Sequence, residues 1–320
     1  MVSDTNSTSP FSLKGDYPFL MKSQPKYRWW KPVAVAVVGL LIFTFFTALS
    51  VLIIYEVSGH DPQVQAVWSP TTDGSYMGGD QNDPFVLLVD FIPLALGIPS
   101  IAIAMRLFGL GGLKTLSSVE GGLRWKRFLS YIPLTFCLAV LVIAIETLIG
   151  VATGDSLGEL TVVPIALLII IVICPFQCAA EEYVFRGFLY QGFASWIPIV
   201  IIPLIIQAVL FASAHGYNSI GLLSVGFMAL CSAWLATMTG GLEASISMLS
   251  VNNVISFGMS SLFVSQTTQA NITIPSLICD LILIVAMTTI LYWISKRKGY
   301  IEEKHPLTDA PDAPVAPVQG

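Results

Sequence analysis

Long apolar runs recur along the chain, and they constrain its fold more than any other feature. A helix needs about 20 apolar residues to cross a hydrocarbon core ~30 Å thick. The runs that approach this length are Val33 to Tyr55, Phe85 to Met105, Phe128 to Val151, Leu160 to Ala180, Ile197 to Ala214, Ile220 to Thr239, Ala244 to Val264 and Ser276 to Ile294. The sequence therefore predicts an all-α fold, a polytopic membrane helical bundle of about eight transmembrane helices.

The composition of the chain fits the same class. Apolar residues make up 55% of the 320 residues and charged residues only 11%, with a mean hydropathy of +0.78. Soluble domains usually carry about 25% charged residues. Most side chains must therefore meet lipid or other apolar helices, which excludes a soluble domain. We expect the lipid bilayer as a partner and no nucleic acid.

Polar segments at the two ends divide the chain into three parts. Residues 1–31 are interpreted as a polar cytoplasmic tail, residues 32–298 as the transmembrane bundle, and residues 299–320, rich in Pro and Ala, as a disordered tail. The cysteines all lie inside apolar runs, where packing is a better interpretation than disulfides or metal ligands. They are Cys137, Cys174, Cys178, Cys231 and Cys279.

The 15 basic residues predict the orientation of the bundle. They are Lys14, Lys22, Lys26, Arg28 and Lys31 before the first run; Arg106, Lys114, Arg124, Lys126 and Arg127 around the connection of the second to the third; Arg186 between the fourth and fifth; and Lys296, Arg297, Lys298 and Lys304 after the last. With eight helices, all of them fall on one side. Cytoplasmic connections are enriched in Lys and Arg, so we expect a multi-pass protein with both termini cytoplasmic.

A charged cluster at the end of the fourth run is the first candidate for chemistry. Ionisable side chains at bilayer depth are costly and mark functional sites. Glu182 and Arg186 are four residues apart, so they can pair on one helix face. Glu181 is rotated by about 100° from Glu182 and points elsewhere. A carboxylate left available in this way can act as a general base toward a water molecule.

His215 is the second candidate, although a single intramembrane histidine is more often structural than catalytic. Phe211 lies one turn earlier and can pack against its imidazole. If the fourth and fifth helices form an antiparallel hairpin, residues equidistant from the turn come level. The midpoint between Glu181 and His215 is Pro198, a residue suited to the first turn of a helix. The two side chains can then share one water molecule.

The seventh run carries a third candidate, the pair Asn252 and Asn253. An asparagine at bilayer depth is costly unless it is hydrogen-bonded. One amide could join two helices, and the other could donate to a developing oxyanion. Three further acids, Asp90, Glu146 and Asp280, are isolated within their runs. For these we expect interhelical hydrogen bonds or a position beside a wet face.

Together these motifs resemble the CAAX protease and bacteriocin-processing (CPBP) family of intramembrane endopeptidases, over a core of about residues 125–265. The resemblance rests on Glu181-Glu182-x-x-x-Arg186, Phe211-x-x-x-His215 and the Asn pair. It implies that Glu181 and His215 activate a water that attacks a peptide carbonyl, that Asn253 stabilises the oxyanion, and that other residues support the site. The supporting residues are Glu182, Arg186, Phe211 and Asn252.

The resemblance also bears on the cofactor, the partner and the location. It implies a peptide or protein substrate and a bacterial plasma membrane. It leaves open a divalent metal such as zinc, which normally takes at least three protein ligands.

The third motif departs from the family pattern. A histidine usually stands four residues before the asparagine, and this chain has Leu249 there. The alternative is therefore a non-catalytic relative, a membrane scaffold or bacteriocin-immunity-type protein that binds a peptide in the same cavity. A third hypothesis, that the protein is a small-solute transporter, is supported only by the buried acidic residues.

Overall fold

The computed structural model describes residues 17–68, 80–153, 159–264 and 274–301. Most of the two expected tails lies outside these ranges. The elements in chain order are η1 (Tyr17–Phe19), α1 (Lys31–Val57), α2 (Pro62–Trp68), α3 (Pro84–Ala95), α4 (Gly97–Leu107), α5 (Leu113–Ser117), α6 (Trp125–Thr153), β1 (Glu159–Leu160), α7 (Pro164–Glu182), η2 (Tyr183–Leu189), α8 (Tyr190–Trp196), α9 (Ile201–Ser213), α10 (Ser219–Thr239), α11 (Glu243–Leu262), β2 (Phe263–Val264) and α12 (Ile274–Arg297).

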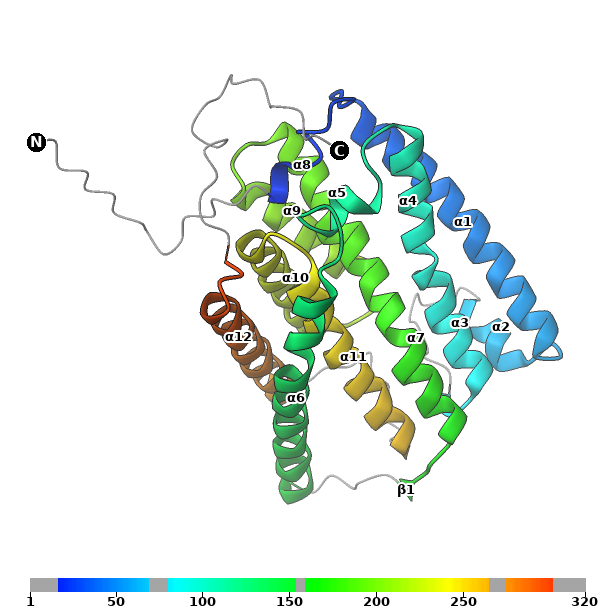
Figure 1. Ribbon diagram of the computed structural model, residues 1–320. Helices are drawn as coiled ribbons and strands as arrows, with labels where there is room; N and C mark the ends of the chain where they lie inside the picture. The colour runs from blue at the N-terminus through cyan, green and yellow to red at the C-terminus, as the bar shows by residue number, and fades with distance from the viewer. Residues whose placement is uncertain (1–16, 69–79, 154–158, 265–273, 302–320) are drawn as a thin grey trace, which may run out of the picture.

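The expected all-α polytopic bundle is confirmed, and each of the eight apolar runs forms a helix or a pair of helices (Figure 1). Among the described residues, 6 segments are long and apolar enough to cross a membrane: α1, α3 with α4, α6, α7 through α8, α10 and α12. The run expected from Ile197 forms the 13-residue α9. At 1.5 Å per residue this helix is about 20 Å long, shorter than a hydrocarbon core.

Several helix ends follow from local sequence. Asp83 caps α3 by accepting from the backbone N–H groups of Phe85 and Val86, and Asn218 caps α10 by accepting from that of Gly221. Gly240 ends α10 with a left-handed backbone, φ 67°. These caps fix where the chain turns back, and hence which helices lie side by side.

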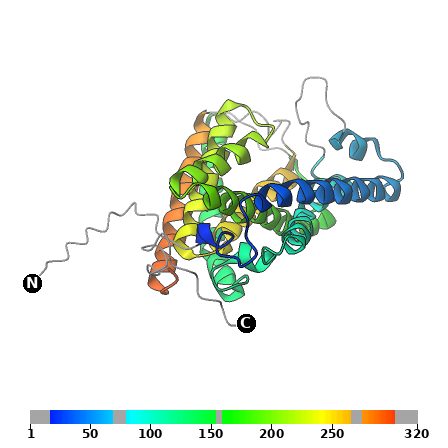
Figure 2. The ribbon, with the colours of Figure 1, turned by 90° about the horizontal axis from the view of Figure 1, so that it is seen from above.

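Helix α11 is the polar helix of the bundle and lies in its interior. It packs against α7, α6, α10 and α12, and Glu243 through Val251 are all buried. Viewed from above, α1 forms an outer edge of the bundle (Figure 2). Polar side chains are tolerated at bilayer depth where protein rather than lipid encloses them. This enclosure explains how the first half of α11 can carry Ser245, Ser247 and Ser250.

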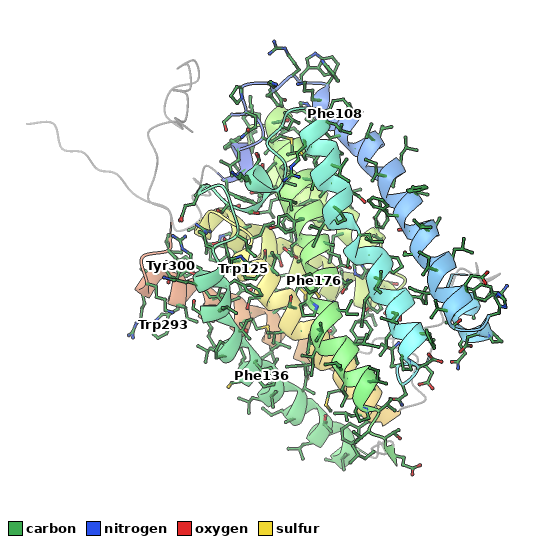
Figure 3. The ribbon with its side chains drawn as sticks, turned by 45° about the vertical axis from the view of Figure 1, so that its right-hand side comes forward. Phe108, Trp125, Phe136, Phe176, Trp293 and Tyr300 are labelled. Carbon is green, nitrogen blue, oxygen red and sulfur yellow. The ribbon has the colours of Figure 1, made fainter. Side chains whose placement is uncertain are left out.

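The outer surface of the bundle is apolar. Large apolar side chains on α1, α6, α7 and α12 are exposed, among them Leu41, Phe136 and Phe176. Phe136 and Phe176 point outward, and Trp125 lies near the beginning of α6 (Figure 3). A helix that is apolar on its outward face suits a lipid environment, which agrees with an integral membrane protein.

Basic residues gather at one end of the bundle. Lys31 Nζ donates to the Phe108 carbonyl at 2.7 Å, which joins the beginning of α1 to the end of α4. The Arg127 guanidinium lies 4.5 Å from the centre of the Tyr300 ring, which joins the beginning of α6 to the segment after α12. We call this the basic end. The strand pair β1–β2 lies at the opposite end (Figure 1).

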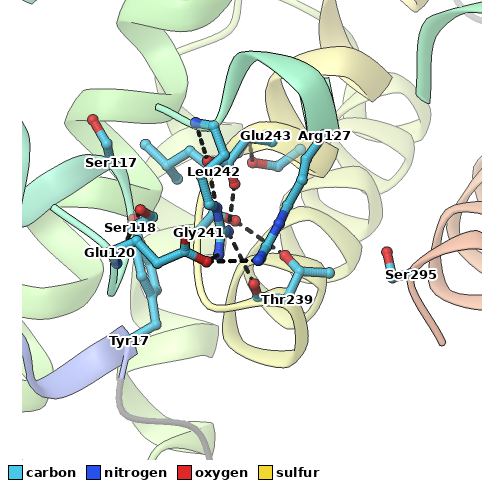
Figure 4. Close-up of polar contacts among 12 residues, drawn as sticks. Tyr17, Ser117, Ser118, Glu120, Arg127, Thr239, Gly241, Leu242, Glu243 and Ser295 are labelled. Carbon is cyan, nitrogen blue, oxygen red and sulfur yellow. Dashed lines mark hydrogen bonds and ion pairs between the residues drawn. The ribbon is translucent and has the colours of Figure 1, made fainter. Parts of the chain in front are cut away.

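A charged network ties the α5–α6 connection to the α10–α11 turn at the basic end (Figure 4). Arg124 donates from Nε and Nη2 to the two oxygens of Glu243, at 2.9 and 2.6 Å, and from Nη2 to the Thr239 carbonyl at 2.9 Å. Arg127 and Arg124 both donate to Glu120. This bidentate pairing anchors the first turn of α11 and so fixes the height of its polar side chains.

Residues 17–30 also pack on the basic end, although the sequence predicted a tail there. Tyr17 is fully buried, and its hydroxyl donates to the Leu116 carbonyl at 2.6 Å. Tyr27 donates to Ser195, and the Trp196 indole donates to the Trp29 carbonyl. The segment thus covers the turn after α8.

Candidate active site

The fourth apolar run continues past its charged cluster, as the hairpin interpretation required. Helix α7 passes at Tyr183 into η2, a π-helix, and then into α8. Wide turns of this kind insert an extra residue and are frequent at functional sites. Gly187 lies within η2, where an added Cβ would be 3.2 Å from the Leu116 Cβ. A small residue is therefore needed where α5 crosses η2.

Glu182 and Arg186 form the expected pair. Their Oε1 and Nη1 atoms are 3.2 Å apart, and both side chains are 0% exposed. Among the described residues, neither carboxylate oxygen of Glu182 and none of the three guanidinium nitrogens of Arg186 has a well-aligned hydrogen bond, although Ser245 lies beside Glu182. Such buried groups are normally hydrogen-bonded, by water if not by protein. The Glu182 carboxylate and the Arg186 guanidinium can therefore each form a hydrogen bond with a further partner.

Glu181 points away from that pair, again as expected. Its carboxylate accepts from the Gln177 amide Nε2 at 2.5 Å, and the side chain is partly exposed. Gln177 is itself buried and lies one turn earlier on α7. Gln177 was not among the predicted site residues, although its i, i+4 spacing from Glu181 could have revealed it. One oxygen of Glu181 is thereby oriented.

The hairpin that brings the second motif toward the first is also present. Helix α8 ends at Trp196, α9 begins at Ile201, and α9 packs on α8 and η2. The turn therefore contains Pro198, the expected midpoint. Phe211 packs on His215 with ring centres 4.7 Å apart, as predicted, and on Phe185 at 4.9 Å.

Arg186 joins the two motifs. Its Cζ atom lies 4.0 Å from the centre of the Phe211 ring, so the guanidinium contacts one residue from each motif. A cation over an aromatic face is attracted to the ring, most strongly when it is shielded from water. The acidic cluster and the histidine turn thus form one cluster.

The position and protonation of His215 follow from one hydrogen bond. Its Nδ1 lies 2.8 Å from the Phe211 carbonyl oxygen. A carbonyl oxygen only accepts, so Nδ1 carries the proton and Nε2 of the neutral ring is left as an acceptor. The neutral ring can therefore accept a proton at Nε2.

The asparagine motif is placed differently from the other two. Asn252 donates to Asn253 Oδ1 at 3.3 Å, and no contact among the described residues joins Asn253 to Glu181 or His215. Leu249 is 3% exposed, and its carbonyl accepts from the Cys178 thiol at 3.7 Å. The position where the family pattern has a histidine thus faces α7 one turn before the glutamates. Its side chain packs in an apolar cluster with Leu87.

The other residues that were singled out from the sequence make packing contacts or interhelical hydrogen bonds. Asp280 accepts an interhelical hydrogen bond from Ser224 at 3.0 Å, as expected for an isolated acid. Cys174 and Cys178 have sulfur atoms 3.9 Å apart and pack in the apolar cluster with Leu249. The side chain of Glu146 lies outside the described part of the structure.

The donor set does not fit a zinc ion. Within the described ranges, no three His, Cys, Asp or Glu side chains gather closely enough to hold a metal. Glu182 is paired with Arg186, which leaves Glu181 and the Nε2 atom of His215 as the candidate ligands of this cluster. A zinc site normally needs at least three protein ligands. We therefore derive no catalytic step through a metal.

One segment of the chain is similar to a known protein family. Residues 163–255 match the family model described as type II CAAX prenyl endopeptidase Rce1-like. The matched segment runs from the beginning of α7 into α11, so it contains all three motifs. No curated protein and no solved structure matches the chain. The family match confirms the resemblance drawn from the motifs.

Proposed function

We propose, on the premise of this family match, that the protein is an intramembrane endopeptidase of the CAAX-protease type. Arg186 provides the observation that carries the proposal. It pairs with Glu182 in the first motif and lies on Phe211 in the second, while Glu181 and the Nε2 atom of His215 remain available. A buried cation that joins the residue after Glu181 to the aromatic residue one turn before His215 supports water activation by these two proton acceptors.

The proposed reaction is addition of water to a peptide carbonyl. Glu181 takes a proton as the water oxygen bonds to the carbonyl carbon, and His215 Nε2 orients the same water. The carbonyl becomes an oxyanion, toward which Asn253 donates its amide. When the C–N bond breaks, the leaving nitrogen takes a proton from Glu181. Glu182 and Arg186 support the site by fixing η2 against Phe211.

Purified protein in liposomes tests this proposal directly. The probe is a fluorescent farnesylated peptide with three residues after the modified cysteine, together with its unmodified counterpart. Mass spectrometry identifies the bond that is cut. We expect Glu181→Ala and His215→Ala to abolish the cut. Glu159→Ala and His60→Ala, which alter an exposed glutamate on β1 and an exposed histidine after α1, should retain it.

The proposal fails if cutting persists undiminished in Glu181→Ala and His215→Ala. Thermal unfolding in detergent shows whether each variant is folded, so loss of activity is not confused with loss of structure.

A second candidate function is peptide binding without cleavage. The observation that favours it is Leu249, whose apolar side chain is buried at the position of the family's histidine. Removal of one oxyanion donor can slow an enzyme by about 10²–10³-fold. Tight binding of the probe peptide to the unaltered protein, with no cut product after prolonged incubation, would favour this candidate.

A further inference from the structure

A cavity of 190 Å³ lies between α6, α11 and α12. Its polar lining comes from Asn252, Ser256 and Asp280, and its apolar lining includes Val142, Ile143 and Leu283. Pockets for drug-sized ligands usually measure about 300–1,000 Å³. This cavity is smaller, and its size suits a single amino-acid side chain.

Asp280 gives the cavity its chemical character. One of its oxygens, Oδ2, accepts from Ser224 on α10, and no ion pair with Asp280 is present among the described residues. A carboxylate at bilayer depth carries a large desolvation cost unless a cation pairs with it. The Asp280 carboxylate therefore lines the cavity without a cationic side chain of the described residues to pair with it.

Tyr217 connects this cavity to the Glu181–His215 cluster. Its ring stacks on the His215 imidazole, with centres 5.7 Å apart and planes inclined by 19°. Tyr217 also stands two residues before α10, whose Ser224 donates to Asp280. Asn252, which lines the cavity, donates to Asn253. The cavity is therefore connected through α10 and α11 to the histidine turn and to the asparagine motif.

We propose that the Asp280 cavity is a specificity subsite that takes the lysine or arginine side chain of the peptide substrate. Both side chains have an aliphatic stem and a charged head. The stem fits the walls of Val142, Ile143 and Leu283. The charged head pairs with Asp280 and donates hydrogen bonds to the side-chain oxygens of Asn252 and Ser256. A bare metal ion fits less well, because hard cations gather six or more oxygen ligands. This inference rests on the proposed peptidase function.

Peptide selectivity provides the first test. The unaltered protein in liposomes is given a set of probe peptides. In each peptide one position near the cut carries lysine, norleucine or glutamate, and every position flanking the cut is varied in turn. At one position lysine should lower KM relative to norleucine by about ten- to a hundredfold, the size expected for a charged hydrogen bond. Asp280→Asn should remove this preference through KM and leave kcat for the norleucine peptide unchanged.

Asp90→Asn is the matched control, because Asp90 is also a membrane-depth acid but lies on α3. It should keep the preference for lysine. Equal KM values for lysine and norleucine peptides at every position, or a lysine preference that survives Asp280→Asn, would overturn the subsite. Both results would leave the peptidase proposal standing, provided that cutting still depends on Glu181.

Thiol labelling provides a second test that needs no catalysis. Cys279 lines the cavity beside Asp280, so it can report the local charge. In a variant that keeps only Cys279, a cationic methanethiosulfonate should react faster than an anionic one of similar size, and a lysine peptide should slow the reaction. Asp280→Asn should remove both effects.

The two tests separate the proposals. If no peptide is cut but the charge-dependent labelling and its protection by the lysine peptide are observed, the subsite stands and the peptidase proposal fails. If both reagents label Cys279 at the same rate, or the lysine peptide gives no protection, the subsite proposal fails, whether or not the protein cuts peptides.

Discussion

Leu249 is the residue that decides between cleavage and binding. It faces α7 one turn before Glu181, four residues ahead of Asn253, and is almost fully buried. We predict that Leu249→His raises the rate of peptide cleavage, because an imidazole there adds a hydrogen-bond donor beside the reacting carbonyl. The rate is measured in liposomes with the farnesylated probe.

Leu249→Met is the matched control, since it keeps an apolar side chain of similar volume and should leave the rate unchanged. A folded Leu249→His protein that cuts no faster than the unaltered protein would contradict the prediction. Thermal unfolding is measured alongside, because a histidine buried in an apolar cluster destabilises the fold.

Residue pairs that are close in sequence were predictable, and those that depend on distant helices were not. The Glu182–Arg186 pair and the Phe211–His215 contact follow from four-residue spacing within one segment. The hydrogen bond from Ser224 to Asp280 joins residues 56 apart, and only the packing of α10 on α12 determines it. The role of Asn253 stays a prediction, since no contact with the other motifs tests it.

At the scale of elements, η2 depends on a buried ion pair. Glu182 and Arg186 are both fully buried, so removing one partner leaves an unpaired charge. We predict that Arg186→Met lowers the free energy of unfolding by about 3–5 kcal/mol. Adding Glu182→Leu should restore most of that loss, because a buried ion pair can be replaced by packed apolar residues.

Thermal unfolding in detergent measures both effects. The double variant should regain stability but remain inactive, since it no longer holds η2 against Phe211. A double variant as unstable as Arg186→Met alone would show that the pair is not the cause of the instability.

The helices were predictable as apolar runs, but their interruptions were only partly so. The run from Phe85 to Met105 is divided between α3 and α4 at Leu96, where a continuous helix was expected. The wide turn of η2 was not predicted either, because its residues have no distinctive local pattern. The turn at Pro198 was predicted, since proline removes a backbone donor and favours the beginning of a helix.

At the scale of the whole molecule, the basic end predicts the orientation in the membrane. Ser23 is exposed at that end and Gln63 is exposed beyond the other end of α1. We predict that Ser23→Cys, in a variant without other cysteines, reacts with a membrane-impermeant maleimide from the cytoplasmic side, because Lys and Arg are retained there. Gln63→Cys should react from the opposite side. Labelling of both positions from one side would contradict this topology.

We propose above all that Glu181 and His215 act on one water molecule. The most direct test is kcat/KM for peptide cleavage by Glu181→Gln, His215→Ala and the double variant. Residues that act as a unit are strongly non-additive. We predict that the double variant is no slower than the slower single variant. A double variant whose loss equals the product of the two single losses would show independent roles and contradict the claim.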